Sequence, residues 1–481
     1  MEEKTEHMLN EATLKGNAEA RKTAVSLKES GKKVICEVSS DDVYAFRGIV
    51  YADYRRMCPS SVADFSALPT MSDLSEYGSL CPQDMSHLVS QLGPDAGLEM
   101  KEGELCLSVT APARVFDKGF SEKLPVMVWI HGGSYLTGGS EDHRYGMERL
   151  VRIGDVIVVK VSYRLGALGY LYLPDSGSIN LGLGDQLNAL SWIDSYISEF
   201  GGDRKNVTVF GQSAGAHSVA SMIAACSGAP PFRKAILQSP PLGIVLSPSS
   251  ASTIASDFLK RLRKICVSSA NNRDSADSFK KMDDNDVLQY ADVDSIIAAQ
   301  SEMRSRHFGL PFMPVFESDC VKEAFSDCST SKSTALSANH LNVCRSRNAL
   351  LHSMVSPNVK VLLCYNAEDA SPYTRKILGR GIYGSAVGRA TTSLATAAFF
   401  RNPAERYASY AKKIGAECEL FRFDWYPAGN EMRCCHSIEL PFLLGKYEDW
   451  KSAQMLRGMT EDEYDSLSRF FLRKWTEFAK S

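Results

Sequence analysis

The alternation of short apolar runs with helical stretches is the feature that most constrains how this chain folds. Most of the runs are continuously apolar, which is typical of strands covered on both faces of a parallel sheet. The sequence therefore predicts an α/β fold, with a large, mostly parallel open sheet and helices on both faces. The predicted strands are Leu124–Ile130, Asp155–Tyr163, Asn206–Phe210, Lys234–Gln238, Val359–Tyr365 and Cys418–Trp425.

Helical periodicity is clearest in two stretches. Within Asp185–Phe200 apolar residues recur at spacings of three and four, which predicts an amphipathic helix. The last helix is predicted to begin after Thr460, because Thr460 and Glu463 have the spacing of a capping box. Residues 246–300 and 317–350 are polar and weakly patterned, and we expect them to be helical or loop insertions on the sheet.

The 481 residues are expected to form one domain. Residues 1–34 are polar, and we expect them to be a poorly ordered N-terminal arm, which leaves residues 35–481 as a single α/β domain. Residues 1–33 contain no apolar run of the kind that a secretory signal has, so we expect a cytoplasmic protein.

Charge and hydropathy argue against two classes of partner. Lys and Arg number 54 and Asp and Glu number 57, so the net charge is −3, and a broad basic footprint for nucleic acid is missing. No run reaches the roughly 18 apolar residues that a membrane span needs. We therefore expect neither a nucleic-acid partner nor a membrane-spanning segment.

The sharpest chemical signal is the pentapeptide GQSAG at 211–215, between the predicted strand Asn206–Phe210 and a helical stretch of small residues at Ala214–Ala224. A Gly-x-Ser-x-Gly motif between strand and helix is typical of a nucleophile elbow, whose tight turn requires glycine on both sides. The turn would hold Ser213 above the sheet edge at a helix N-terminus, which favours developing negative charge. Ser213 is therefore the predicted nucleophile.

A second glycine-rich segment, HGGS at 131–134, directly follows the predicted strand Leu124–Ile130. Backbone N–H groups in such a loop can stabilise an oxyanion, and the N–H of Ala214 would add another donor. We interpret His131 as a residue that orders this loop rather than as a base.

A serine hydroxyl needs a general base, because it is barely ionised at neutral pH. In elbow enzymes the chain order is serine, acid, histidine. His436 follows the predicted strand Cys418–Trp425 and a Pro/Gly loop, so it is the predicted base. His217 lies on the same helix as Ser213, which is the wrong geometry. The histidines that precede the best acid candidates are His307, His340 and His352.

The acid should follow the preceding predicted strand, Val359–Tyr365. Asp369 and Glu368 both leave that strand, and either carboxylate could accept the Nδ1–H of His436 and hold the imidazole in the correct tautomer. Asp369 is the favoured acid and Glu368 the alternative.

These motifs belong to an ordered series that continues along the chain. It includes VMVWIHGGSYLTGGS (126–140), VSYRLGALGYL (161–171), NLGLGDQLNALSWI (180–193), FGGDRKNVTVFGQSAGAHSV (200–219), VLLCYNAEDAS (361–371) and CHSIELPFLLG (435–445). The series resembles the type-B carboxylesterase/cholinesterase family, whose members have the α/β-hydrolase fold. The resemblance runs from about residue 35 to the C-terminus.

The resemblance implies a serine hydrolase that cleaves small-molecule carboxylic esters through an acyl-enzyme, without a cofactor or metal. It places Ser213, Asp369 and His436 at the positions of the catalytic triad. The family's oxyanion-hole positions are Gly133, Ser134 and Ala214. Cys81 and Cys106 match a disulfide of secreted members, which is not expected in a cytoplasmic protein.

The chain departs from the family pattern at three points. Ser134 replaces a glycine of the oxyanion loop, where a positive φ would strain a serine. Asp369 is one methylene shorter than the usual glutamate, so we expect either that His436 lies closer to it or that the contact between them is looser. Only 67 residues separate the acid from the base, which predicts a smaller or more open pocket.

Two other classes of function fit the same residues. An acyltransferase, lactonase or amidase would keep the acyl-enzyme and change the acceptor or the bond that is broken. A non-catalytic binding protein is the other alternative, because the family contains adhesion proteins on this fold. Those members lack a complete triad, whereas all three positions are filled here.

Overall fold

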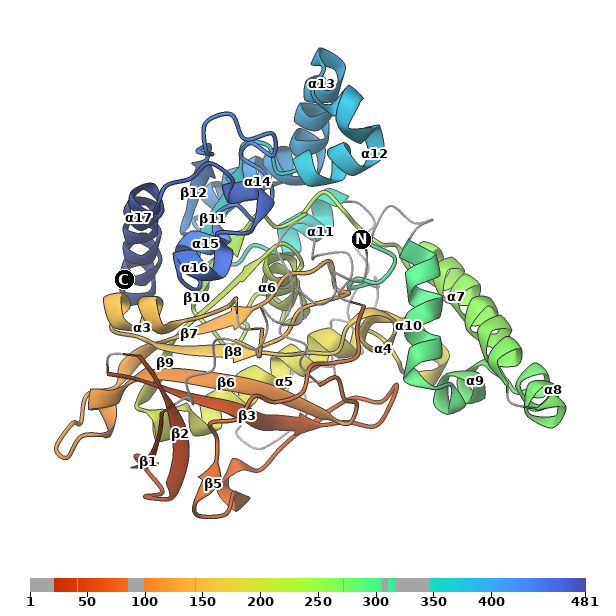
Figure 1. Cartoon of the computed structure of the whole chain (residues 1–481). Coiled ribbons are helices and arrows are strands. Elements are labelled where there is room, and N and C mark those ends of the chain that lie inside the picture. Colours follow the sequence, from red (N-terminus) through yellow and green to blue (C-terminus); the bar gives the residue numbers. More distant parts are fainter. Residues whose placement is uncertain are drawn as a thin grey trace, which may run out of the picture.

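The structure is a computed structural model, and it describes residues 21–40, 42–84, 99–142, 144–270, 272–304, 310–316 and 347–481. A 12-stranded sheet runs through the molecule in the order β1-β2-β3-β6-β8-β7-β9-β10-β11-β12, with β4 paired to β3 and β5 paired to β2 (Figure 1). The prediction of a large α/β sheet is confirmed.

The second half of the sheet is parallel and contains all six predicted strands. Each pair of neighbours from β8 to β12 runs in the same direction, so their carboxyl ends meet at one edge of the sheet. Their bounds are β7 (Leu124–Ile130), β8 (Ile157–Val161), β9 (Gly202–Gln212), β10 (Lys234–Gln238), β11 (Lys360–Asn366) and β12 (Cys418–Phe423).

The first half of the sheet is antiparallel, and it corrects the predicted domain boundary. β1 pairs with β2 from Lys22 to Ser26, so the chain from Arg21 onwards belongs to the sheet and is not an arm. The remainder of the predicted arm, residues 1–20, lies outside the described residues. These strands are β1 (Lys22–Ser26), β2 (Lys33–Ser40), β3 (Val43–Asp53), β4 (Ser61–Val62), β5 (Ser72–Asp73) and β6 (Glu104–Pro112).

Both faces of the parallel strands are buried, which explains why their sequences are continuously apolar. Val128 packs into a core with α5 (Leu181–Tyr196) and α6 (Ala214–Ala225). The next residue, Trp129, packs into a separate core with α3 (Glu148–Gly154) and α17 (Glu461–Lys480). Successive side chains of one strand thus enter different helical layers.

The two helices predicted from the sequence are present, and their ends lie within about one turn of the predicted ends. The helix expected over Asp185–Phe200 is α5, followed by a short 3₁₀ turn that ends at Phe200. α17 begins after Thr460, whose side chain accepts from the Glu463 N–H while the Glu463 carboxylate accepts from the Thr460 N–H. The predicted capping box is therefore present.

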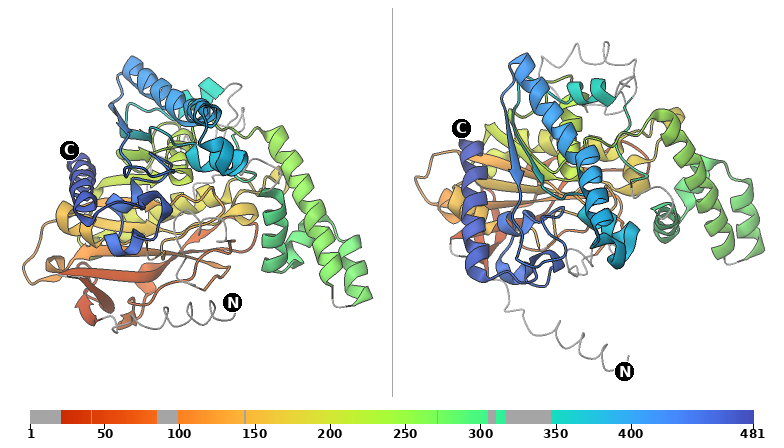
Figure 2. Two further views of the ribbon diagram at one scale, coloured as in Figure 1. Left: turned by 45° about the horizontal axis from the view of Figure 1, so that its top comes forward. Right: turned by 90° about the horizontal axis from the view of Figure 1, so that it is seen from above.

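Two helical groups project from the sheet (Figures 1 and 2). The first fills the predicted polar insertion at 246–300 with α7 (Pro248–Ser269), α8 (Arg273–Lys281), α9 (Asp284–Tyr290) and α10 (Val293–Arg304). The second projects separately, at the top of Figure 1, and consists of α12 (Ser371–Tyr383) and α13 (Ala386–Thr396), followed by α14 (Asn402–Ile414).

Shorter helices complete the layers. They are α4 (Gly166–Tyr170), α11 (Arg347–Ser353), α15 (Leu440–Leu443) and α16 (Tyr447–Trp450). Most of the second predicted insertion, 317–350, lies outside the described residues. Within the described part of the chain, no helix is both long and apolar enough to cross a bilayer.

Candidate active site

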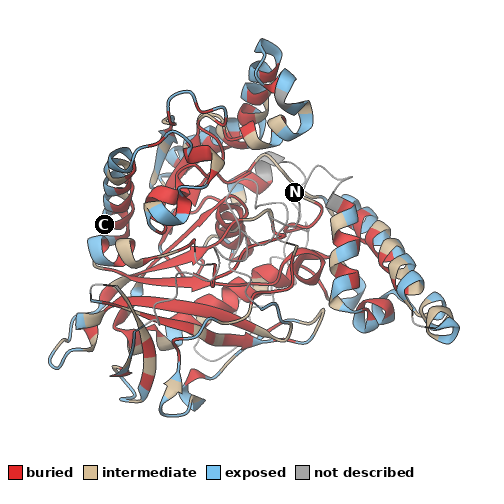
Figure 3. Cartoon of the chain, viewed as in Figure 1, coloured by how far each residue is buried: buried red, intermediate tan, exposed pale blue. Residues whose placement is uncertain are grey.

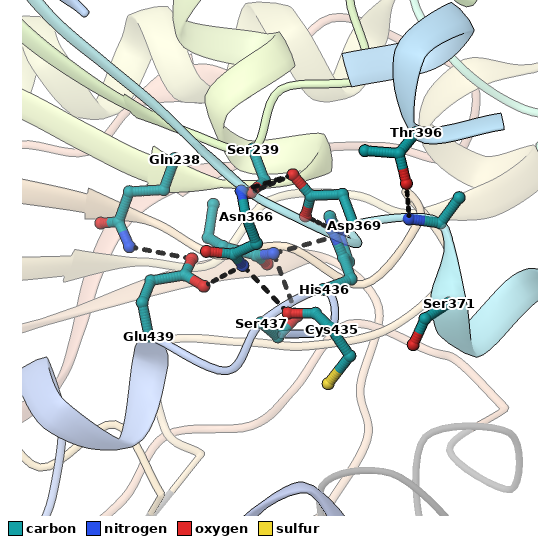
Figure 4. A network of polar contacts seen from close by, with 12 residues as sticks. Gln238, Ser239, Asn366, Asp369, Ser371, Thr396, Cys435, His436, Ser437 and Glu439 are labelled. Atoms are coloured by element: carbon teal, nitrogen blue, oxygen red, sulfur yellow. Dashed lines mark hydrogen bonds and ion pairs between the residues drawn. The ribbon is translucent and has the colours of Figure 1, made fainter. Parts of the chain in front are cut away.

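The predicted site residues meet at the carboxyl edge of the parallel strands. The HGGS loop leaves β7, the elbow leaves β9, Asp369 follows β11 and His436 follows β12. Parallel strands with adjacent carboxyl ends bring residues together that are far apart in sequence. Figure 4 shows Asp369 and His436 beside the ends of these strands.

Ser213 is held in a strained turn between β9 and α6. Its φ of 56° and ψ of −120° lie outside the common regions for a residue with a side chain. A Cβ added to Gly215 would lie 2.0 Å from the carbonyl oxygen of Ile130, and one added to Gly211 would lie 2.7 Å from that oxygen. The two flanking glycines are therefore required sterically, as the elbow motif predicts. The Ser213 N–H donates to Gln238 O at 2.8 Å, and Ser213 is 7% exposed.

The HGGS loop lies against this elbow. A Cβ added to Gly132 would be 3.3 Å from the Ser213 Cβ. Gly133 has a φ of 113° and Ser134 a φ of 59°, so the serine occupies the left-handed conformation that the sequence analysis expected to be strained. The N–H groups of Leu136 and Thr137 both donate to Gly133 O, at 2.9 and 3.1 Å, and stabilise the turn.

Ala214 is the first residue of α6, and its N–H has no acceptor within the helix. This N–H belongs to the residue that directly follows Ser213. The three proposed oxyanion donors thus come from two loops in contact, and the helix dipole adds partial positive charge at Ala214.

His436 and Asp369 are joined by a hydrogen bond of 2.8 Å from Nδ1 to Oδ1. The other carboxylate oxygen, Oδ2, accepts from the Asn366 N–H at 2.8 Å and from the Ser239 hydroxyl at 3.0 Å (Figure 4). Asp369 is 0% exposed and His436 is 4% exposed. Two donors besides the imidazole therefore hold the buried carboxylate in place.

The alternative acid, Glu368, points elsewhere. Its carboxylate pairs with Arg433 at 2.7 Å, and burial raises its pKa. Its backbone forms a bridge with Cys435, the residue before the histidine, and its N–H donates to Cys434 O at 3.0 Å. This bridge holds the two chain segments close together, which lets the short aspartate reach the ring of His436.

The Nε2 side of His436 faces the elbow. Gln212, the residue before the nucleophile, has its Nε2 3.1 Å from the His436 Nε2 and donates to the Ser437 hydroxyl at 3.0 Å. The side chain of Tyr373 of α12 lies beside that of Ser213, and its ring lies 5.7 Å from the His436 ring between centroids. Phe400 packs on the same imidazole at 5.2 Å. Tyr373 and Gln212 are therefore neighbours of both Ser213 and His436.

A buried polar network continues behind the site. The Glu439 carboxylate accepts from Asn366 Nδ2 at 2.6 Å and from Gln238 Nε2 at 3.3 Å, and Asn366 Nδ2 also donates to Cys435 O at 3.0 Å. Burial raises the pKa of Glu439. Figure 4 shows this network linking the ends of β10 and β11 to the loop that carries His436.

Five residues around the site were not predicted from the sequence, and they are Gln212, Ser239, Tyr373, Asn366 and Glu439. Ser239 and Asn366 carried a usable signal, because they occupy the ends of two predicted strands. Tyr373 carried none, since its neighbours are set by the direction in which α12 leaves the sheet.

The other predicted roles of histidines can also be located. His131 is fully buried, stacks on Tyr163 with 4.4 Å between centroids, and donates from Nδ1 to Gly132 O at 2.7 Å. His217 is bonded through Nδ1 to the Tyr135 hydroxyl at 2.6 Å, away from the nucleophile. Burial lowers the pKa of both histidines to about 4. His352 stacks on Tyr410, whereas His307 and His340 lie outside the described residues.

The two cysteines that match a disulfide of the family are not bonded to each other. Cys81 and Cys106 are both free and buried, and burial raises the pKa of Cys106 to about 12. Across the described ranges, no three His, Cys, Asp or Glu side chains are grouped in a way that could hold a metal ion.

Comparisons with known proteins agree with this architecture. A family model described as the carboxylesterase family matches residues 28–481. The chain is similar to a probable N-octanoylanthranilate hydrolase of Rhodococcus erythropolis, with 30% identity over 444 residues that cover 91% of this chain and 89% of that protein. It is also similar to a para-nitrobenzyl esterase of Bacillus subtilis, with 32% identity over 419 residues that cover 85% and 80%. A solved PNB esterase structure matches with a TM-score of 0.71 and 25% identity, over 95% of this chain and 90% of that one.

Proposed function

The chain belongs to the carboxylesterase family, and on this premise we propose that Ser213, His436 and Asp369 hydrolyse carboxylic esters through an acyl-enzyme. The observation that carries the assignment is the 2.8 Å hydrogen bond between His436 Nδ1 and the buried Asp369, beside a serine in a strained elbow. An imidazole held through Nδ1 presents its Nε2 to the elbow, where Gln212 Nε2 lies 3.1 Å away, and this nitrogen is the one that would take the proton of the serine hydroxyl.

The reaction would proceed in two halves. The Ser213 Oγ attacks the acyl carbon while His436 Nε2 takes its proton, and Asp369 stabilises the imidazolium. The N–H groups of Gly133, Ser134 and Ala214 stabilise the oxyanion. His436 then protonates the leaving alcohol, and a water molecule activated by the same histidine releases the acid.

The assignment is tested with Ser213→Ala, for which we expect ester turnover to fall by up to ~10⁶-fold, because the nucleophile is removed. The matched control is Ser221→Ala, which removes a buried hydroxyl from the same helix away from the proposed triad. Hydrolysis is measured with p-nitrophenyl esters of graded chain length. A fluorophosphonate probe should label the wild type and the control but not the Ser213 variant. Near-wild-type turnover by that variant would contradict the assignment.

A second bond type deserves a parallel assay, because one relative is named as a probable hydrolase of N-octanoylanthranilate. The same acyl-enzyme can form from an amide if His436 protonates the departing nitrogen. Comparison of N-octanoylanthranilate with an octanoyl ester on the same preparation would measure the preference. Loss of both activities in Ser213→Ala would show that one site performs both.

A further inference from the structure

The hairpin of α12 and α13 has an unusual concentration of exposed apolar side chains. Of the fifteen large apolar residues that are well exposed in the described chain, six lie between Tyr373 and Phe399. Leu394 is 72% exposed, Val387 66% and Ile377 60%. Figure 3 shows the hairpin projecting from the body, with exposed residues along both helices. Side chains of this size on a projecting element indicate an interaction surface.

The same segment is exclusively cationic. From Ser371 to Ala404 the sequence contains five Arg or Lys residues and no Asp or Glu, although the whole chain has a net charge of −3. Lys376 and Arg389 are exposed. Arg375 pairs with Glu431 at 3.0 Å, so its charge is partly neutralised from a neighbouring loop. Apolar side chains among Lys and Arg are typical of helices that lie at a membrane interface.

The hairpin is also continuous with the candidate active site. Tyr373 lies in the first turn of α12 and contacts both Ser213 and His436. Thr374 is hydrogen-bonded to Thr392 between hydroxyls at 2.7 Å, which ties α12 to α13. A surface bound at the hairpin would therefore lie close to the proposed nucleophile.

We propose that α12 and α13 dock on an anionic lipid surface. Ile377, Val387 and Leu394 enter the boundary between headgroups and acyl chains, while Lys376 and Arg389 contact the anionic headgroups. A second copy of this chain is a poorer partner for the same face, because each copy would present the same cationic charge. The docking does not depend on the proposed esterase activity.

The test is flotation of the full chain with vesicles. We expect binding to equal parts phosphatidylglycerol and phosphatidylcholine, about tenfold weaker binding to phosphatidylcholine alone, and weakening by added salt. The double variant Val387→Asn with Leu394→Asn should lose at least about tenfold in binding, because two apolar contacts are removed. Lys376→Glu should lose about tenfold through its charge.

Matched controls lie on the other helical group. Tyr290→Asn changes an apolar residue that is 66% exposed on α9, and Lys264→Glu reverses an exposed charge on α7. Both should bind vesicles like the wild type, and so should Ser213→Ala, whose esterase result is read separately. Unchanged urea midpoints establish that the variants are folded.

Three outcomes would overturn the proposal. They are failure of the wild type to bind the anionic vesicles, equal binding by the double variant, and a stable dimer that the double variant dissociates in sedimentation experiments.

Discussion

Two adjacent carboxylates at the end of β11 have opposite surroundings. Asp369 faces His436 and accepts from Asn366 and Ser239, whereas Glu368 is paired with Arg433. Sequence reasoning could narrow the acid to these two residues, because only they leave the strand at the required point. The choice between them depends on which way the chain turns after Asn366. The direction of this turn is set by the backbone bridge between Glu368 and Cys435, the residue before His436.

The pair offers a matched test at this scale. Asp369→Asn should lower kcat by about 10⁴-fold, because the amide favours the wrong tautomer of the imidazole. Glu368→Gln should change kcat by no more than a few-fold. Both are measured with one p-nitrophenyl ester at saturating concentration. A larger loss of kcat in Glu368→Gln than in Asp369→Asn would identify Glu368 as the acid in place of Asp369.

Two buried histidines make stability depend on pH. His131 and His217 have pKa values of about 4 in the folded chain, and the unfolded values are near 6.5. Between these values the unfolded chain binds more protons, so the free energy of unfolding should fall as the pH drops from about 6.5 to about 4. His217→Asn removes one titrating group and should lose less stability between pH 7 and pH 5 in urea titrations. The control is the exposed His352→Asn, and an equal loss in both variants would contradict the prediction.

At the scale of elements, the capping box predicted from Thr460 and Glu463 is present at the start of the last helix. Thr460 caps α17, whose Trp475 donates from Nε1 to Gln238 Oε1 at 3.1 Å and so joins the helix to β10. Thr460→Ala should lower the free energy of unfolding by about 1 kcal/mol, because the first turn loses its cap. Ser466→Ala, on the exposed side of the same helix, should be close to neutral. Guanidinium titration measures both, and equal midpoints would refute the role of the cap.

Strands differed in how well they could be predicted, for a physical reason. β7 and β10 have the predicted bounds, because burial on both faces makes their sequences continuously apolar. β1 was missed, since only one of its five residues is buried and the others are polar or partly exposed. The triad positions and both glycine loops could be located from motifs. Tyr373 and Gln212 could not be assigned to the site, because their contacts depend on how distant segments pack.

At the scale of the whole molecule, the sheet separates two cores, and the candidate site occupies the edge where the parallel strands end. The proposed lipid-docking hairpin follows the carboxyl end of β11 at this same edge, and α7, α8 and α9 form a separate projection (Figure 1). One side of the molecule therefore combines the proposed chemistry with the proposed attachment.

The order in which the strands occur along the chain has a consequence for biosynthesis. The elbow serine emerges from the ribosome long before the imidazole that is proposed to activate it, because β12 is the final strand of the sheet and His436 follows it. A nascent chain that stops short of this point carries the proposed nucleophile without the proposed base. Hydrolysis should therefore begin only after the chain has been translated beyond His436, and products that terminate before this residue should be inert.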